Sequence, residues 1–192
     1  MGSPKDSGHL EISRRELLGR VGGGLLILTV STPWGEITPA EARAKGASFK
    51  NLTAEEGALL EELGDVLLPG AREAGVAHYV DDQLSRRDPL LFLKYMEYPA
   101  SHLEFYRQGL AALDRLSQLR HSSLFARASQ EQKIAAIREI SQKSPEGWNG
   151  PPAPLFYFVV RNDAVDVYYG GEEGFARLQI PYMPHLPPPA KW

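Results

Sequence analysis

Apolar residues recur at helical spacing through most of the chain after residue 52. They fall three and four positions apart, which places them on one face of a helix. The segments with this spacing are 53–68, 76–84, 90–96, 102–116, 130–140 and 155–168. No segment sustains the alternation of apolar and polar residues that is typical of a half-buried strand. The pattern predicts an all-α fold, a small helical domain.

Local signals mark where several of these helices begin and end. Three capping boxes place Ser or Thr three residues ahead of Glu or Gln, so that each side chain can accept a hydrogen bond from a backbone N–H of the other residue. They are Thr53–Glu56, Ser101–Glu104 and Ser129–Gln132. Asp88-Pro89 predicts the start of the helix at 90–96. Pro69-Gly70 should end the first helix, and Gly170-Gly171 should end the last one in a left-handed conformation. Residues 143–154, rich in Pro and Gly, should form a loop.

The first 44 residues differ from the rest. An Arg pair precedes a weakly apolar run at 21–30, and small residues then offer A-x-A cleavage sequences at 40–42 and 42–44. This order is typical of a bacterial signal peptide. The paired Arg before two leucines resembles the twin-arginine signal, whose export route carries folded proteins. The signal residues are Ser13, Arg14, Arg15, Leu17 and Leu18.

Two alternatives for this segment are a transmembrane anchor and an amphipathic cytosolic extension. A membrane span needs about 20 apolar residues, and the run offers roughly half that. We therefore predict a signal peptide and linker over 1–44, a helical domain over 45–180 and an extended tail over 181–192. The sequence leaves open whether the signal is removed.

The tail contains five prolines, which exclude a helix and favour a polyproline-like strip. Such a strip cannot bury its own side chains, so its apolar residues must lie against its own domain or against another protein. Both alternatives stay open at this point. Aromatic residues are also plentiful between 156 and 175, a density that is more typical of a core or an interface than of a cofactor site.

Composition and charge exclude several kinds of chemistry. The chain has no Cys, which excludes disulfides, thiolate nucleophiles, Fe–S clusters and covalent haem attachment. The net charge of −3 argues against nucleic acid as a partner. The five histidines are isolated from one another, so we expect no metal site. The acidic residues of the first two helices are expected on a solvated face; they are Glu61, Glu62, Asp65, Asp81 and Asp82. No catalytic constellation is visible, and the profile is that of a subunit.

Several motifs resemble the gluconate 2-dehydrogenase subunit 3 family. The sequence LGDVLLPG at 63–70, followed by EAGV at 73–76 and YVD at 79–81, is similar to the region that reads ADxLLP, EAGV and fID in those proteins. FYFVVR at 156–161 and YYGG at 168–171 are similar to a helix and a glycine element of the family. Glu172 stands where the family usually has Asn, which makes this chain a divergent member. The resemblance covers residues 52–192.

The resemblance implies a function. In that family the small subunit is not the oxidoreductase and carries no cofactor. It accompanies a large FAD-dependent catalytic subunit of the glucose-methanol-choline class, often with a c-type cytochrome that contains haem. A flavoprotein acquires FAD in the cytoplasm and must fold before export, so a folded partner with a twin-arginine signal could escort it through the twin-arginine translocase to the periplasm. The expected function is a non-catalytic accessory and export subunit of a sugar or polyol dehydrogenase.

The alternative is a stand-alone exported binding or scaffold protein that uses its Pro-rich tail on some other partner. On the first interpretation, the contacts with the catalytic subunit come from aromatic and aliphatic residues of the last helix and the tail. The predicted interface residues are Phe156, Tyr168, Tyr169, Tyr182, Met183, Leu186 and Trp192.

Overall fold

A computed structural model describes residues 28–179 of the chain. Its elements are β1 (Val30–Thr32), β2 (Gly35–Ile37), α2 (Pro39–Ala44), α3 (Ala54–Leu67), α4 (Val76–Leu84), η1 (Phe92–Tyr95), α5 (His102–His121), η2 (Phe125–Arg127), α6 (Gln130–Gln142), α7 (Ala153–Tyr169) and α8 (Glu172–Arg177). The fold is mostly helical, as the sequence predicts, with one small hairpin. Among the described helices, none is long and apolar enough to cross a membrane.

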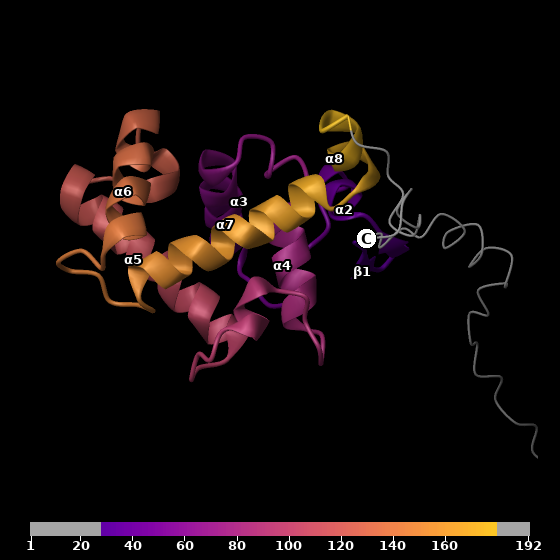
Figure 1. Ribbon diagram of the computed structural model, residues 1–192, viewed down its shortest axis with the longest axis horizontal. Helices are drawn as coiled ribbons and strands as arrows, with labels where there is room; N and C mark the ends of the chain where they lie inside the picture. Colours follow the sequence, from indigo (N-terminus) through magenta and orange to yellow (C-terminus); the bar gives the residue numbers. More distant parts are fainter. Residues whose placement is uncertain (1–27, 180–192) are drawn as a thin grey trace, which may run out of the picture.

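Helix α7 is the central element of the fold. It crosses the middle of the molecule from the α5–α6 end to the α2–α8 end (Figure 1) and contacts α3, α4, α5, α6, α8 and η1. Phe156, Val159, Val160 and Ala164 are completely buried along it. A helix that is surrounded in this way needs apolar residues on most of its circumference, which explains the continuous apolar run in the sequence.

The capping boxes at Thr53 and Ser129 form as predicted, and helices α3 and α6 begin directly after them. The third box forms only in part. Ser101 accepts a hydrogen bond from the Glu104 backbone N–H, but the Glu104 carboxylate accepts one from Gln108 Nε2 at 2.8 Å. The helix still begins where the box predicts, because one capping bond satisfies one of its free N–H groups.

Two predicted helix features are wrong. The segment 90–96 forms only the short 3-10 helix η1, because distant side chains hold its backbone: Gln83 Oε1 accepts from Leu90 N–H and Asp163 Oδ1 accepts from Phe92 N–H, both at 2.8 Å. The end of α7 is not left-handed either. Gly170 has φ −73° and the chain turns directly into α8, which the sequence pattern did not predict.

The largest difference from the sequence-based picture lies at 28–44. Here β1 and β2 pair antiparallel, with Val30 opposite Ile37, and α2 follows. Strands of three residues are too short to show an alternation. The hairpin and α2 both contact α4, so this segment belongs to the same packed unit as the helices. The predicted boundary between residues 44 and 45 is therefore not an edge of the fold.

Candidate functional site

The strongest polar cluster in the described chain is built on α4. All of its residues except Leu84 are buried, among them His78, Asp81 and Asp82. The expectation of a solvated face is therefore wrong for these two aspartates. A buried carboxylate is stable only where hydrogen bonds replace its water shell, and both carboxylates meet this condition.

Asp81 organises the chain ahead of α3. Its Oδ2 accepts a hydrogen bond from Lys50 N–H at 2.7 Å, and its Oδ1 accepts from the N–H groups of Asn51 and Leu52, each at 2.8 Å. The Asn51 side chain returns a hydrogen bond to the Asp81 carbonyl at 2.7 Å. Three successive backbone donors on one carboxylate fix the turn that leads into the Thr53 cap.

Asp82 fastens the N-terminal hairpin to α4. Its carboxylate accepts hydrogen bonds from Ser31 N–H at 3.0 Å, from Lys50 Nζ at 2.9 Å and from Arg86 Nε at 2.8 Å. Burial raises the pKa of Asp82, but the hydrogen bonds from Lys50, Ser31 and Arg86 outweigh burial, and the pKa lies below its usual value. Asp82 is therefore a carboxylate that links three segments.

His78 lies beside the same cluster. Its Nε2 is 2.9 Å from the Ala47 carbonyl, and its ring packs on Phe49 with the centroids 4.6 Å apart. The hollow between the hairpin and α4 has a volume of about 10 Å³, which is room for about one water molecule. In residues 28–179, no three His, Asp or Glu side chains gather as metal ligands would. The hydrogen bonds of Asp81 and Asp82 join the hairpin and the turn before α3 to α4.

A second buried carboxylate lies on α7. Asp163 is completely buried and accepts hydrogen bonds from the Tyr106 hydroxyl and from Phe92 N–H. Burial raises the pKa of Asp163 to about 7. Burial and the neighbouring Asp163 also raise the pKa of Tyr106. Asp163 is not among the residues predicted from the motifs, although an acidic residue inside an apolar helix pattern is a signal that could have found it.

The predicted interface residues divide into three groups. Phe156 is completely buried against Phe105 and Trp148, so it belongs to the core and we correct its assignment to the interface. Tyr168 and Tyr169 are partly exposed at the end of α7. The other interface residues lie outside the described residues, as do the signal residues Ser13, Arg14, Arg15, Leu17 and Leu18; these interface residues are Tyr182, Met183, Leu186 and Trp192.

The two tyrosines of α7 form a small aromatic corner. Their rings are perpendicular with centroids 4.8 Å apart, and the Arg177 guanidinium lies 4.4 Å from the Tyr168 ring centroid. The Tyr168 ring also packs against Gly70, where φ is +96° and a Cβ would lie within 2.6 Å of the ring. The tertiary structure therefore joins the LLPG and YYGG motifs, about 100 residues apart, in one corner.

An exposed aromatic patch that the sequence did not separate from the core lies beside η1. Phe158 packs edge-on against Phe92 with the centroids 5.1 Å apart, and Tyr95 is 68% exposed next to them. Leu90 and Val165 are also exposed. Aromatic side chains of this kind are enriched at protein interfaces.

The geometry defines a class of protein: a small helical domain whose buried polar groups hold its own elements together and whose aromatic residues are partly exposed around one helix. The family comparison agrees with that class. The model of the family "Gluconate 2-dehydrogenase subunit 3" matches residues 54–187, more than two thirds of the chain, and the chain belongs to this family of small subunits of dehydrogenase complexes. No curated protein and no solved structure matches the chain.

Proposed function

We propose that this chain is the non-catalytic accessory and export subunit of a periplasmic FAD-dependent sugar or polyol dehydrogenase. It escorts a large flavoprotein of the glucose-methanol-choline class through the twin-arginine translocase, and FAD belongs to that partner. A c-type cytochrome would be the natural acceptor of the electrons. The observation that carries the proposal is membership of a family of small dehydrogenase subunits.

The sequence of the first 44 residues supports the export role. Arg14-Arg15 precedes Leu17-Leu18 and a weakly apolar run, which is the order of a signal for folded cargo. A flavoprotein that binds FAD in the cytoplasm must cross the membrane in its folded state. A subunit that carries such a signal and binds the flavoprotein tightly would give that partner a route across the membrane.

The geometry at one end of the fold supports a partner face there. Leu28, where the described chain begins, packs near Gly170, and α8, after which it ends, contacts α7. The described chain thus begins and ends at the same end of the molecule, beside α8 and the last turn of α7 (Figure 1). A partner bound to this corner would contact Tyr168, Tyr169 and the predicted tail.

The test is co-expression of this chain with its proposed flavoprotein partner, followed by fractionation of periplasm and cytoplasm. Changing Arg14 and Arg15 to Lys together should leave both proteins in the cytoplasm, because the signal is then no longer recognised. Arg20→Lys is the matched control, since it makes the same chemical change outside the pair and should leave export unchanged.

The flavoprotein should reach the periplasm only when the intact chain is present. Equal export of the flavoprotein without this chain would contradict the escort role. The purified chain should also be colourless and bind no flavin, which absorbance at the flavin wavelengths checks directly.

A further inference from the structure

We propose that residues 28–44 are a permanent part of the folded protein and that the folded chain is not cut at the A-x-A sequences that end at Ala42 and Ala44. The exported protein then begins at or before Leu28. This inference rests on the proposed function in that it concerns an exported chain, although the contacts that support it do not depend on export.

Both A-x-A sequences lie in helix α2 or at its end. Thr38 caps this helix: its hydroxyl accepts from Glu41 N–H, and the Glu41 carboxylate accepts from Thr38 N–H at 2.9 Å. Ala42 is completely buried. The backbone on both sides of the two cleavage points is hydrogen-bonded, with Ala42 N–H donating to the Thr38 carbonyl and Lys45 N–H to the Glu41 carbonyl, both at 2.9 Å.

The start of α2 packs directly on the start of α4. Gly75 has φ +83°, and a Cβ at that position would lie 2.2 Å from the Pro39 carbonyl oxygen and 2.8 Å from Ala40 N. Only a glycine allows this approach of two backbones. Arg43 adds an ion pair with Glu61 of α3 at 3.3 Å, so α2 is fixed from two sides.

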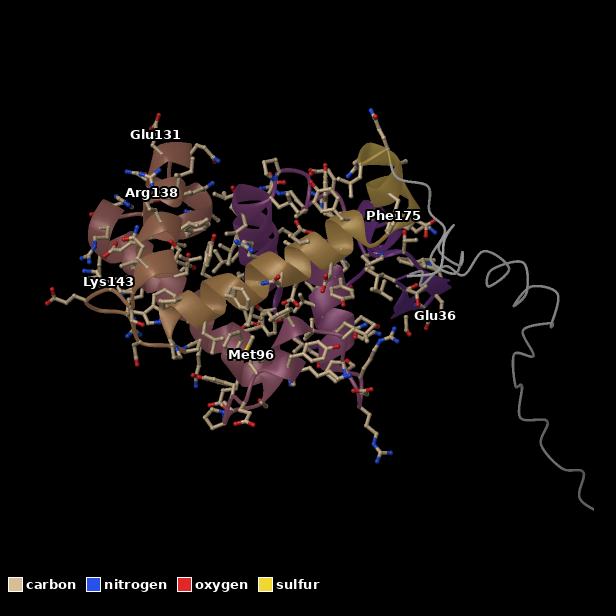
Figure 2. All side chains as sticks on the ribbon, viewed as in Figure 1. Glu36, Met96, Glu131, Arg138, Lys143 and Phe175 are labelled. Carbon is tan, nitrogen blue, oxygen red and sulfur yellow. The ribbon has the colours of Figure 1, made fainter. Side chains whose placement is uncertain are left out.

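The hairpin before α2 is fixed as firmly. Val30 is 3% exposed, and Leu28 packs against the core. Asp82 accepts from Ser31 N–H at 3.0 Å, and Arg86 Nη2 donates to the Thr29 carbonyl at 3.0 Å. The outer side of the hairpin carries Glu36 at the same end of the molecule as Phe175 of α8 (Figure 2). Removing residues up to 42 or 44 would expose the apolar groups under Val30 and Ala42 and leave Asp82 without one of its donors.

These contacts have a consequence for processing. A peptidase needs an extended chain in its active site, so it can cleave a folded segment only after that segment has locally unfolded. The cleavage rate therefore depends on how often the segment unfolds. A protein exported by the twin-arginine route is already folded when it meets the peptidase. Both A-x-A sequences are then folded into helix α2 and inaccessible to the peptidase. Any cleavage must occur in the segment that precedes Leu28.

The first experiment determines the N-terminus of the chain purified from the periplasm, by intact mass and by sequencing of the N-terminal peptide. The expected N-terminus lies at or before Leu28. A chain that begins at Arg43 or Lys45 would overturn the inference while leaving the export role intact. A chain that never reaches the periplasm would contradict the proposed function, and the second experiment then tests the inference alone.

The second experiment treats purified full-length chain with leader peptidase in detergent and follows products that begin at Arg43 or Lys45. Val30→Asp places a charge under the hairpin and should yield these products, whereas Trp34→Asp, at a side chain 59% exposed in the turn, should behave like the unchanged chain. Thr38→Ala removes only the cap of α2, which should raise the cleavage rate about fivefold without unfolding the domain. Cleavage of the unchanged chain as fast as the Val30→Asp and Thr38→Ala variants would overturn the inference.

Discussion

Three buried aspartates in this small domain show how the same side chain serves opposite electrostatic roles. Asp81 and Asp82 are surrounded by donors, and in Asp82 these donors lower the pKa despite burial. Asp163 has two donors and no cation among its hydrogen-bond partners, so burial dominates and raises its pKa to about 7. The number and charge of the neighbouring donors account for the opposite pKa shifts of Asp82 and Asp163.

The raised pKa of Asp163 predicts a pH dependence of stability. The folded protein holds a proton on Asp163 up to about pH 7, whereas the unfolded chain loses it near pH 4. The contribution of Asp163 to the free energy of unfolding is therefore complete below pH 4 and is lost as the pH rises to 7. Asp163→Asn removes this effect, so the stability difference between the two proteins should change by on the order of 2–3 kcal/mol from pH 5 to pH 8.

Urea unfolding at pH 5, 6, 7 and 8 measures this change. Several other groups face Asp163. They are Tyr106, Tyr79 and Asp166, whose own pKa values are all raised, and the Phe92 N–H group. Asp88→Asn is the control, because its side chain is 80% exposed and the change should leave the pH slope as it is. A constant difference between the Asp163→Asn variant and the unchanged protein at all four pH values would show that Asp163 is ionised throughout.

At the scale of elements, the domain depends on the close packing of helices around α7. Gly109 of α5 lies against the Phe156 ring, where an added Cβ would approach ring carbons to 2.2 Å. Phe156 is completely buried, so its ring cannot move into solvent. The two helices can approach this closely because position 109 has no side chain.

Gly109→Ala tests this contact. In a helix with free space beside it, the change would stabilise by up to about 1 kcal/mol because alanine favours helix. Here the added methyl forces α5 and α7 apart, and we expect the free energy of unfolding to fall by about 2 kcal/mol. Urea unfolding gives both the sign and the size of the effect.

Ala111→Gly, on the exposed side of the same helix, calibrates the intrinsic preference and should cost about 1 kcal/mol. A Gly109→Ala variant that is more stable than the unchanged protein would show that α5 and α7 are less closely packed at this point than the structure indicates.

At the scale of the whole molecule, the two ends of α7 have different surroundings. Glu131, Arg138 and Lys143 lie at the α6 end, far from the hairpin and α8 (Figure 2). The Tyr168–Tyr169 corner lies at the opposite end of α7, where the described chain also begins and ends. The partner face that we propose at this corner is therefore far from the α6 end.

Deleting residues 181–192 tests whether the tail belongs to that partner face. We expect the flavoprotein to be lost from co-purification while the melting temperature of the isolated subunit stays the same, because the tail anchors Tyr182, Met183, Leu186 and Trp192 would contact the partner. A polyproline strip extends about 3 Å per residue, so twelve residues can cover much of the roughly 800 Å² that one side of a standard interface buries.

Replacing only Tyr182 and Trp192 by Ser keeps the length of the tail and isolates the role of its side chains. A large fall in the melting temperature with the flavoprotein still bound would instead mean that the tail packs on its own helices.

The sequence by itself determined the helical class, the starts of α3, α5 and α6, the bounds of α4 and the family. These features depend on local patterns: apolar spacing along a helix and side chains that cap their own backbone three residues away. Each can be recognised without knowing which residues pack against that segment in the fold.

Only the tertiary structure decided the features that depend on contacts between distant residues. Asp163 accepts a hydrogen bond from the N–H of Phe92, 71 positions away, and the predicted helix at 90–96 is shortened to η1. Asp82 holds Ser31, 51 positions away, and joins to the domain a segment that resembles a signal linker. Phe156 can be buried in the core because its ring packs against Gly109 of α5, which has no side chain. No local pattern encodes these partners, since burial and hydrogen bonding depend on which segments the fold brings together.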